Sequence, residues 1–255
     1  MFLIVLSPAK TLDFERKLNC KQSTIPSFLQ ESKSLINYLL KMKKEEIGKL
    51  MSISQKLTDL NYERYRSWNK DFNITNARHA ISCFTGDVYK GLDVNSFSSD
   101  DLNYSQHHLR ILSGLYGVLR PLDLMKPYRL EMGVKLKTER GKNLYDFWEN
   151  KITENLNQNL SDNNNQYLIN LASNEYFDSV HKNKLIKKVI TPKFLDEKNG
   201  VYKVISFFAK KARGSMASYI IKNKIETLEG LQQFDGLKYR FSSEKSDESN
   251  LVFIR

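Results

Sequence analysis

Apolar residues recur with two different spacings along this chain, and the spacing predicts which segments are strands and which are helices. Residues 2–6, FLIVL, form an uninterrupted apolar run that ends at Ser7 and Pro8, which predicts a strand buried on both faces. Leucines, isoleucines and methionines recur every three or four positions over residues 27–43 and 44–60. This spacing predicts two amphipathic helices after the first strand.

The remaining elements are predicted from the same patterns and from capping and turn residues. The segment Ser98–Asp101 supplies side-chain oxygens and acids that favour a helix start, and we expect that helix to run toward Leu112. Two further helices are predicted over residues 143–160 and 215–224. Strands are predicted over residues 80–89, 166–172, 190–196, 201–208 and 251–254. The pair Asn199–Gly200 favours a tight hairpin between two of these strands, because both residues tolerate a positive φ.

These elements predict one domain. The chain has 255 residues, a length that a single domain can reach. Its clearest polar stretches, residues 161–166 and 242–250, are expected to be surface loops, since the composition does not change from one side of them to the other. Strands and helices are mixed without strict alternation. We therefore expect an α+β fold in which residues 1–255 form a single compact mixed-sheet domain with peripheral helices.

The charge of the chain indicates an anionic partner. Lys and Arg number 40 against 29 Asp and Glu, which gives a net charge of +11. Polyanions, anionic lipid headgroups and small phosphorylated molecules are the natural partners of such a surface. A membrane-surface role is disfavoured, since no predicted helix combines a basic face with exposed aromatic residues. The two cysteines lack disulfide spacing and the apolar start is short, so we expect a cytoplasmic protein without a membrane partner.

The most distinctive motif is LSGLYG at residues 112–117. Its two glycines, three positions apart, permit a sharp turn whose amide groups can bind phosphate oxygens, with an arginine on either side. Such a turn resembles the hairpin of a helix-hairpin-helix DNA-binding element, here placed at about residues 100–125. The alternative is a tight turn with a glycine cap. The candidate DNA contacts are Arg110, Ser113, Gly114, Leu115, Tyr116, Gly117 and Arg120.

Two other basic segments are candidate anion sites. In AKKARGSM, residues 209–216, cations cluster where a predicted strand meets a predicted helix, and no acid occurs from residue 201 to residue 225. An anion would relieve their opposition to the helix dipole, and the alternative is a solvated charged turn. Lys10 follows the first buried strand, where ligands of mixed sheets bind, although a lone lysine is commonly just exposed.

Catalytic and metal-binding patterns are sparse. His79 and Cys83 have helical spacing without further ligands nearby, and no hydrolase, zinc-protease or calcium-loop motif occurs. We therefore predict no metal site and no cofactor, and we favour a binding protein over an enzyme. The alternative is an enzyme that acts on a small phosphorylated or carboxylated substrate, with Lys10, Arg110 and Arg213 lining its cleft and a base that the sequence does not identify.

Several long blocks resemble the YaaA family of bacterial peroxide-stress proteins. They are LSPAKTLDF, FTGDVYKGL, QHHLRILSGLYGVLRPLDLMKPYRLEMG, INLASNEYF and FLDEKNGVYKVISFFAKKARGSMASYII, in that order. The resemblance implies a fold peculiar to the family and a cytosolic protein that binds duplex DNA with little sequence preference and helps limit free iron during peroxide stress. It gives Leu112–Leu119 the role of the hairpin. The candidates that it implies for a basic cleft are Lys10, Arg110, Arg129, Lys210, Lys211 and Arg213.

Overall fold

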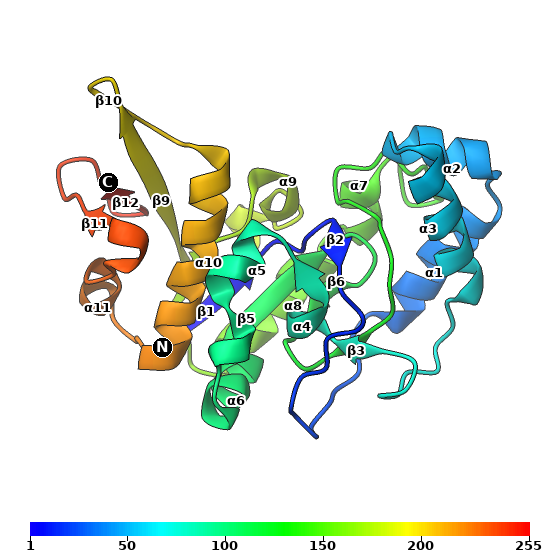
Figure 1. Ribbon diagram of the computed structural model, residues 1–255, viewed down its shortest axis with the longest axis horizontal. Coiled ribbons are helices and arrows are strands. Elements are labelled where there is room, and N and C mark those ends of the chain that lie inside the picture. Colours follow the sequence, from blue (N-terminus) through cyan, green and yellow to red (C-terminus); the bar gives the residue numbers. More distant parts are fainter.

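A mainly parallel sheet runs through the centre of the protein, whose computed structural model describes residues 1–255 (Figure 1). The strands are β1 (Phe2–Leu6), β2 (Thr11–Leu12), β3 (Arg78–His79), β4 (Phe84–Thr85), β5 (Leu109–Ser113), β6 (Gly117–Leu119), β7 (Leu124–Met125), β8 (Tyr167–Asn170), β9 (Lys188–Lys198), β10 (Val201–Lys203), β11 (Arg240–Phe241) and β12 (Asn250–Ile254). The central order is β11-β12-β9-β8-β1-β5-β6, and β10 pairs with β9.

The pairing directions make this a mixed sheet. The five central strands, from β12 through β9, β8 and β1 to β5, are parallel to one another. The outer strands β6, β10 and β11 are antiparallel to theirs. The apolar run of residues 2–6 is β1, which lies between β8 and β5 and is buried throughout. The predicted α+β mixed sheet and the predicted first strand are therefore confirmed.

Helices surround the sheet. They are α1 (Leu29–Leu40), α2 (Lys44–Met51), α3 (Gln55–Ser67), α4 (Ala80–Cys83), α5 (Asp87–Leu92), α6 (Ser99–His108), α7 (Leu144–Trp148), α8 (Lys151–Asp162), α9 (Asn174–Phe177), α10 (Ser206–Asn223) and α11 (Leu228–Gln232), with short 3₁₀ turns at η1 (Val94–Ser96), η2 (Lys182–Lys184) and η3 (Gly236–Lys238). One continuous core of buried apolar residues joins helices and sheet, as expected for one compact domain.

The longest helix, α10, packs on α5 with the two backbones in direct contact. A Cβ at Gly214 of α10 would lie 1.7 Å from the carbonyl oxygen of Val88 in α5. A Cβ at Gly91 of α5 would lie 2.0 Å from the carbonyl oxygen of Lys211. Only glycine permits so close an approach. This contact fixes α10 against α5, so that the basic start of α10 lies beside the carboxyl end of the sheet (Figure 1).

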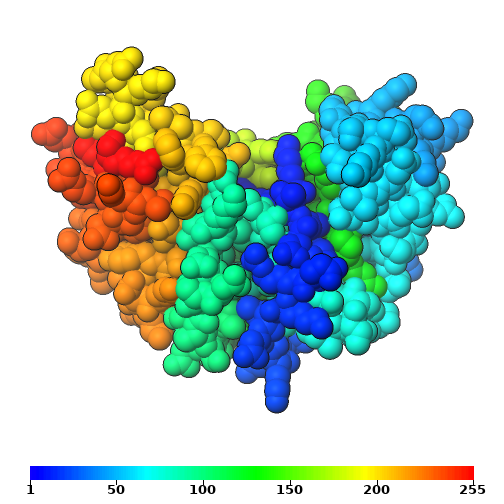
Figure 2. Space-filling view, viewed as in Figure 1, coloured from blue at the N-terminus to red at the C-terminus, as the bar shows by residue number.

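Two arms rise from the central body and leave a hollow between them (Figure 2). Helices α1, α2 and α3 form the first arm, and the β9–β10 hairpin with α10, α11 and the last strands forms the second (Figure 1). The floor of the hollow includes the segment that follows β1 and the region of α9. We call this hollow the inter-arm groove.

Several predicted boundaries required correction. The predicted helix at residues 44–60 is two helices, α2 and α3, because Ser52 adopts a left-handed φ of 51° that ends the first. The predicted helix at residues 143–160 is likewise broken at Glu149, whose φ is 45°. The segment 80–89, predicted as a strand, instead contains α4, β4 and the start of α5. In each case local dihedral angles or tertiary packing override an apolar pattern.

The last third of the chain follows the prediction more closely. Asn199 and Gly200 have φ values of 55° and 76° and join β9 to β10 by a tight turn, as predicted. The predicted strand at residues 201–208 ends early, because α10 begins at Ser206 and not at Ser215. Phe207, which the prediction placed in this strand, lies instead in the first turn of α10 and is exposed.

Candidate functional site

The predicted helix-hairpin-helix element is a buried β-hairpin, so this prediction was wrong. Helix α6 stops at His108, and β5 pairs with the antiparallel β6 through Ser113 and Gly117. Leu115 and Tyr116 at the turn are fully buried. Apolar residues on both strands pack into the core, which explains why this segment is a buried strand pair and not two exposed helices.

The polar groups of this turn are bonded within the protein. The N–H of Tyr116 donates to Oγ of Ser113 at 3.0 Å. The carbonyl oxygen of Leu115 accepts from Oγ of Ser32 at 2.9 Å. Because this amide is occupied and the turn is enclosed, the predicted contacts of Ser113, Leu115 and Tyr116 are inaccessible to a DNA backbone.

The two glycines of the turn are required by packing. A Cβ at Gly114 would lie 2.2 Å from the carbonyl oxygen of Leu130. Gly117 has a φ of +67°, and a Cβ there would lie 2.7 Å from the ring of Trp148. Trp148 also donates its indole N–H to the carbonyl oxygen of Gly114 at 3.0 Å. The glycines therefore serve close packing in the core and do not form a phosphate-binding cavity.

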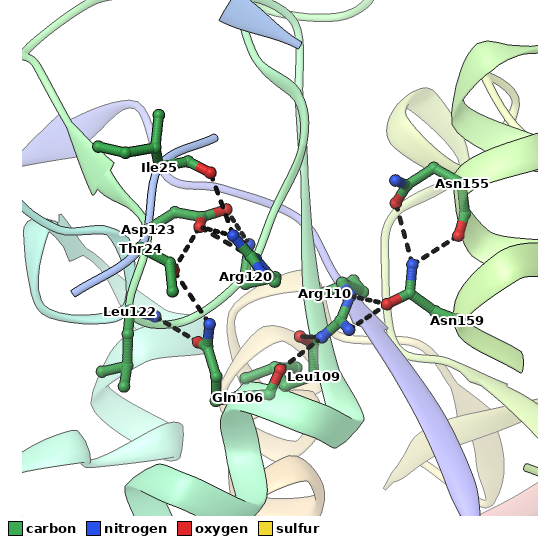
Figure 3. Close-up of polar contacts among 10 residues, drawn as sticks. All are labelled: Thr24, Ile25, Gln106, Leu109, Arg110, Arg120, Leu122, Asp123, Asn155 and Asn159. Atoms are coloured by element: carbon green, nitrogen blue, oxygen red, sulfur yellow. Dashed lines mark hydrogen bonds and ion pairs between the residues drawn. The ribbon is translucent and has the colours of Figure 1, made fainter. Parts of the chain in front are cut away.

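Arg110 is buried on β5 and bonds to neighbouring carbonyl groups (Figure 3). Its guanidinium donates to the carbonyl oxygens of Gln106 and Leu109 at 2.9 and 2.7 Å and to Oδ1 of Asn159. Burial lowers the pKa of Arg110 to about 10. A cation at these carbonyls caps the C-terminus of α6, where the helix dipole favours positive charge. The predicted exposure of Arg110 to DNA or to a substrate was therefore wrong.

Arg120 anchors an N-terminal segment (Figure 3). Its Nη2 lies 3.0 Å from Oδ1 of the buried Asp123 and donates to the carbonyl oxygen of Ile25 at 3.1 Å. Asp123 also accepts from the hydroxyl of Thr24 at 2.6 Å. Arg120 is therefore engaged in a structural network that holds the segment before α1, and it does not line the inter-arm groove.

Three residues of the predicted basic cleft do lie together. Lys10, Lys210 and Arg213 line one cavity in the floor of the inter-arm groove. Lys10 comes from the loop that follows β1, whereas the other two come from the first half of α10. β1 and β8 are parallel, so their carboxyl ends lie at the same edge of the sheet. Ser7 and Ser173, which follow these two strands, line the cavity, so it lies beyond their carboxyl ends, where α/β sheets bind ligands.

Arg129 lies near Lys10 because both cations contact the carboxylate of Glu131. Its Nη2 lies 2.9 Å from Oε1 of Glu131, and Nζ of Lys10 lies 3.4 Å from the same oxygen. Lys211, in contrast, does not line the cavities that contain Lys10. The structure thus brings four of the predicted cleft residues, Lys10, Arg129, Lys210 and Arg213, into one neighbourhood and leaves Lys211 outside it.

Sequence reasoning missed the opposite half of the groove. Lys49 at the end of α2 and Lys135 in a long loop line a second cavity, which shares Lys10 and Glu175 with the first. Both are exposed, and neither has a carboxylate within 4.0 Å. No local pattern marks these lysines, since each is a single cation in a mixed segment.

The structure places the remaining candidate ligands apart from the groove. His79 is buried and its Nε2 lies 2.8 Å from the carbonyl oxygen of Gln22. Cys83 is buried as a free thiol. No group of three or more His, Cys, Asp or Glu residues is arranged to hold a metal ion. None of the helices has the length and apolar character needed to span a bilayer.

One protein-family model matches nearly the whole chain. The family model described as peroxide stress protein YaaA matches residues 2–245, which include every helix and every strand except β12. The chain belongs to this family of peroxide stress proteins. A role in peroxide stress is therefore supported for this protein.

Proposed function

We propose that this protein acts in peroxide stress by binding duplex DNA along the inter-arm groove with little preference for base sequence. The observation that carries the proposal is the placement of exposed lysines on both sides of the groove. Lys210 stands on the second arm, Lys49 on the first, and Lys135 in the loop that lines the second cavity. None of the three has a carboxylate within 4.0 Å.

Phosphate contacts from such lysines supply affinity but carry no base-sequence information. The net charge of +11 adds a long-range field that attracts a polyanion. This mechanism differs from hairpin recognition, because it needs no amide of the buried turn between β5 and β6. Bound protein would shield DNA from iron-driven oxidation by covering the backbone, without an iron site of its own.

A salt titration tests this proposal. Binding of a short fluorescein-labelled duplex is measured by fluorescence anisotropy, and we expect log Kd to rise with log salt at a slope of about 0.9 per phosphate neutralised. The variant with Lys49→Gln, Lys135→Gln and Lys210→Gln should bind weakly, with the slope reduced by about one for each lysine removed. A second duplex of unrelated sequence should bind equally well.

The matched control removes three lysines from the opposite side of the molecule. Lys187 precedes β9 at the amino end of the sheet, Lys224 lines a cavity with Met1, and Lys222 lies at the same end of α10. Changing these three to Gln lowers the net charge equally, and we expect affinity and slope to stay near those of the wild type. Equal losses in both variants would reject the groove as the interface, and no binding by the wild type would reject DNA binding altogether.

Protection is tested separately. Supercoiled plasmid is exposed to ferrous iron and hydrogen peroxide, and the fraction nicked is measured on agarose gels. We expect the wild-type protein to reduce nicking and the groove variant to protect less at equal concentration. Equal protection by both proteins would contradict a shielding mechanism that acts through the groove.

A further inference from the structure

The cavity that contains Lys10, Lys210 and Arg213 has the size and position of a small-molecule site. Its volume is about 300 Å³, which falls at the lower end of ordinary ligand pockets. The hydroxyl-bearing residues Ser7 and Ser173 also line it. It lies in the groove floor, beyond the carboxyl ends of β1 and β8 (Figure 2).

Arg213 is the most informative residue of the cavity. Its side chain is partly buried, and burial alone lowers its pKa, with no carboxylate or hydrogen bond acting in the opposite direction. It forms no ion pair within 4.0 Å. Partial withdrawal of a guanidinium from water without an acceptor is unfavourable. An anion in the cavity would supply the missing partner.

The carboxylates near the cavity are already engaged. Glu131 binds Arg129 at 2.9 Å and Lys10 at 3.4 Å. Oε1 of Glu175 accepts the N–H of Gly133 at 3.2 Å. Asp87 lies 4.0 Å from the ammonium group of Lys90 in its own helix. Asp87 and Glu175 line the cavity together with Arg213 and Lys210, but neither carboxylate lies within 4.0 Å of these two cations.

Ordered hydroxyl groups accompany these cations. Oγ of Ser7 accepts the N–H of Ser173 at 2.8 Å and donates to Oγ of Ser173 at 3.2 Å, so the hydroxyl hydrogen of Ser173 is the one left for a ligand. The phenol of Tyr89 donates to the carbonyl oxygen of Ser7 at 3.0 Å, which holds this loop in place. Hydroxyl, ammonium and guanidinium donors together exceed what the two oxygens of a carboxylate can accept. A phosphate monoester, with three terminal oxygens and nearly two charges, matches them better.

We propose that this cavity binds the phosphate group of a small phosphate monoester of nucleotide size, with Arg213 as its principal partner and Lys210 and Lys10 beside it. This site shares Lys210 with the proposed DNA contacts, whereas Arg213 and Lys10 are not among those contacts. A phosphodiester of continuous DNA offers only two free oxygens and one charge, which satisfies fewer of these donors.

The test uses AMP as the probe and adenosine as its uncharged counterpart. Isothermal titration calorimetry at low salt should show AMP binding to the wild-type protein and no binding of adenosine. Arg213→Met should weaken AMP binding by at least about tenfold, the loss expected from a charge-assisted bidentate contact. Arg213→Lys should fall between the two, because it keeps the charge and loses the planar fork.

Thermal unfolding separates a ligand-binding role from a structural one. Because Arg213 lacks a partner in the chain, Arg213→Met should leave the Tm unchanged or raise it, while the Tm increase caused by AMP disappears. The control Lys222→Met, on the same helix, should retain the AMP response. Absence of AMP binding by the wild type, or full AMP affinity in Arg213→Met, would overturn the inference.

Anisotropy with the labelled duplex keeps this result independent of DNA binding. Arg213→Met should retain duplex affinity within a few-fold while losing the AMP response. A protein that binds AMP and not DNA would refute the proposed function and support the pocket. A protein that binds DNA and not AMP would do the reverse.

Discussion

Replacing Gly117 by alanine should destabilise the protein strongly, although the change adds a single methyl group. The residue has a φ of +67°, and the new Cβ would lie 2.7 and 2.9 Å from two ring carbons of Trp148 and 3.1 Å from Phe28. The left-handed conformation costs a non-glycine residue about 1–2 kcal/mol. Forcing the methyl into a packed core costs about a further 1–3 kcal/mol. The free energy of unfolding should therefore fall by about 2–5 kcal/mol.

Gly200→Ala is the matched control for this substitution. Gly200 has a similar φ of +76°, yet nothing lies within 4 Å of a Cβ built there. The free energy of unfolding of Gly200→Ala should fall only by the cost of the left-handed conformation, about 1–2 kcal/mol. Urea-induced unfolding followed by circular dichroism measures both, and the difference between the variants reports packing against Trp148. Equal losses in the two proteins would refute the conclusion that the turn is enclosed by the core.

Three further outcomes follow from buried groups. Replacing Arg110 by Met should lower stability by at least about 1–3 kcal/mol, because the carbonyls it bonds would be left without a donor. Burial lowers the pKa of His79 and His108 below the ordinary 6.5, so their contribution to stability should be complete above pH 6.5 and decline below it, measured as the urea midpoint against pH. Burial raises the pKa of the Cys83 thiol, so a thiol reagent should modify Cys20 first and reach Cys83 only after unfolding in urea.

The sequence predicted the parts of the fold that depend on local signals. The apolar run of residues 2–6 identified β1, because a run of five residues that ends at Ser7 and Pro8 has the length of a buried strand and is too short for a helix. Ser98 identified the start of α6, where its Oγ accepts the N–H of Asp101 at 3.1 Å. The pair Asn199–Gly200 identified the hairpin between β9 and β10. In each case the sequence signal lies within a few consecutive residues, even though β1 pairs with strands that are distant in the sequence.

The segment Leu109–Leu119 shows why the hairpin was misjudged. Seven of its eleven residues are apolar and they do not alternate, so its periodicity does not distinguish a buried helix from a buried strand. The well-capped α6 before it extended the helical prediction too far. Both glycines were interpreted as phosphate-binding features, because Leu130 and Trp148, against which Gly114 and Gly117 pack, lie outside the motif.

The groove could be predicted only in part. The rule that ligands bind beyond the carboxyl ends of strands placed Lys10 correctly in the groove floor. Its convergence with Arg213, Lys49 and Lys135 depends on how the two arms are oriented, which no local pattern encodes. Likewise the burial of Arg110 follows from the position of Asn159 on α8, a long-range contact.

The bare backbone contact at Gly91 and Gly214 has a mechanical consequence. Side chains between two packed helices can change rotamer when the helices slide. At Gly91 and Gly214 no side chain separates the two backbones, so this adjustment is not available there. Helix α10 is therefore coupled directly to α5, and the wall that carries Arg213 should move with the body of the protein. Any widening or narrowing around a guest molecule would then come mainly from displacement of the three-helix arm on the other side.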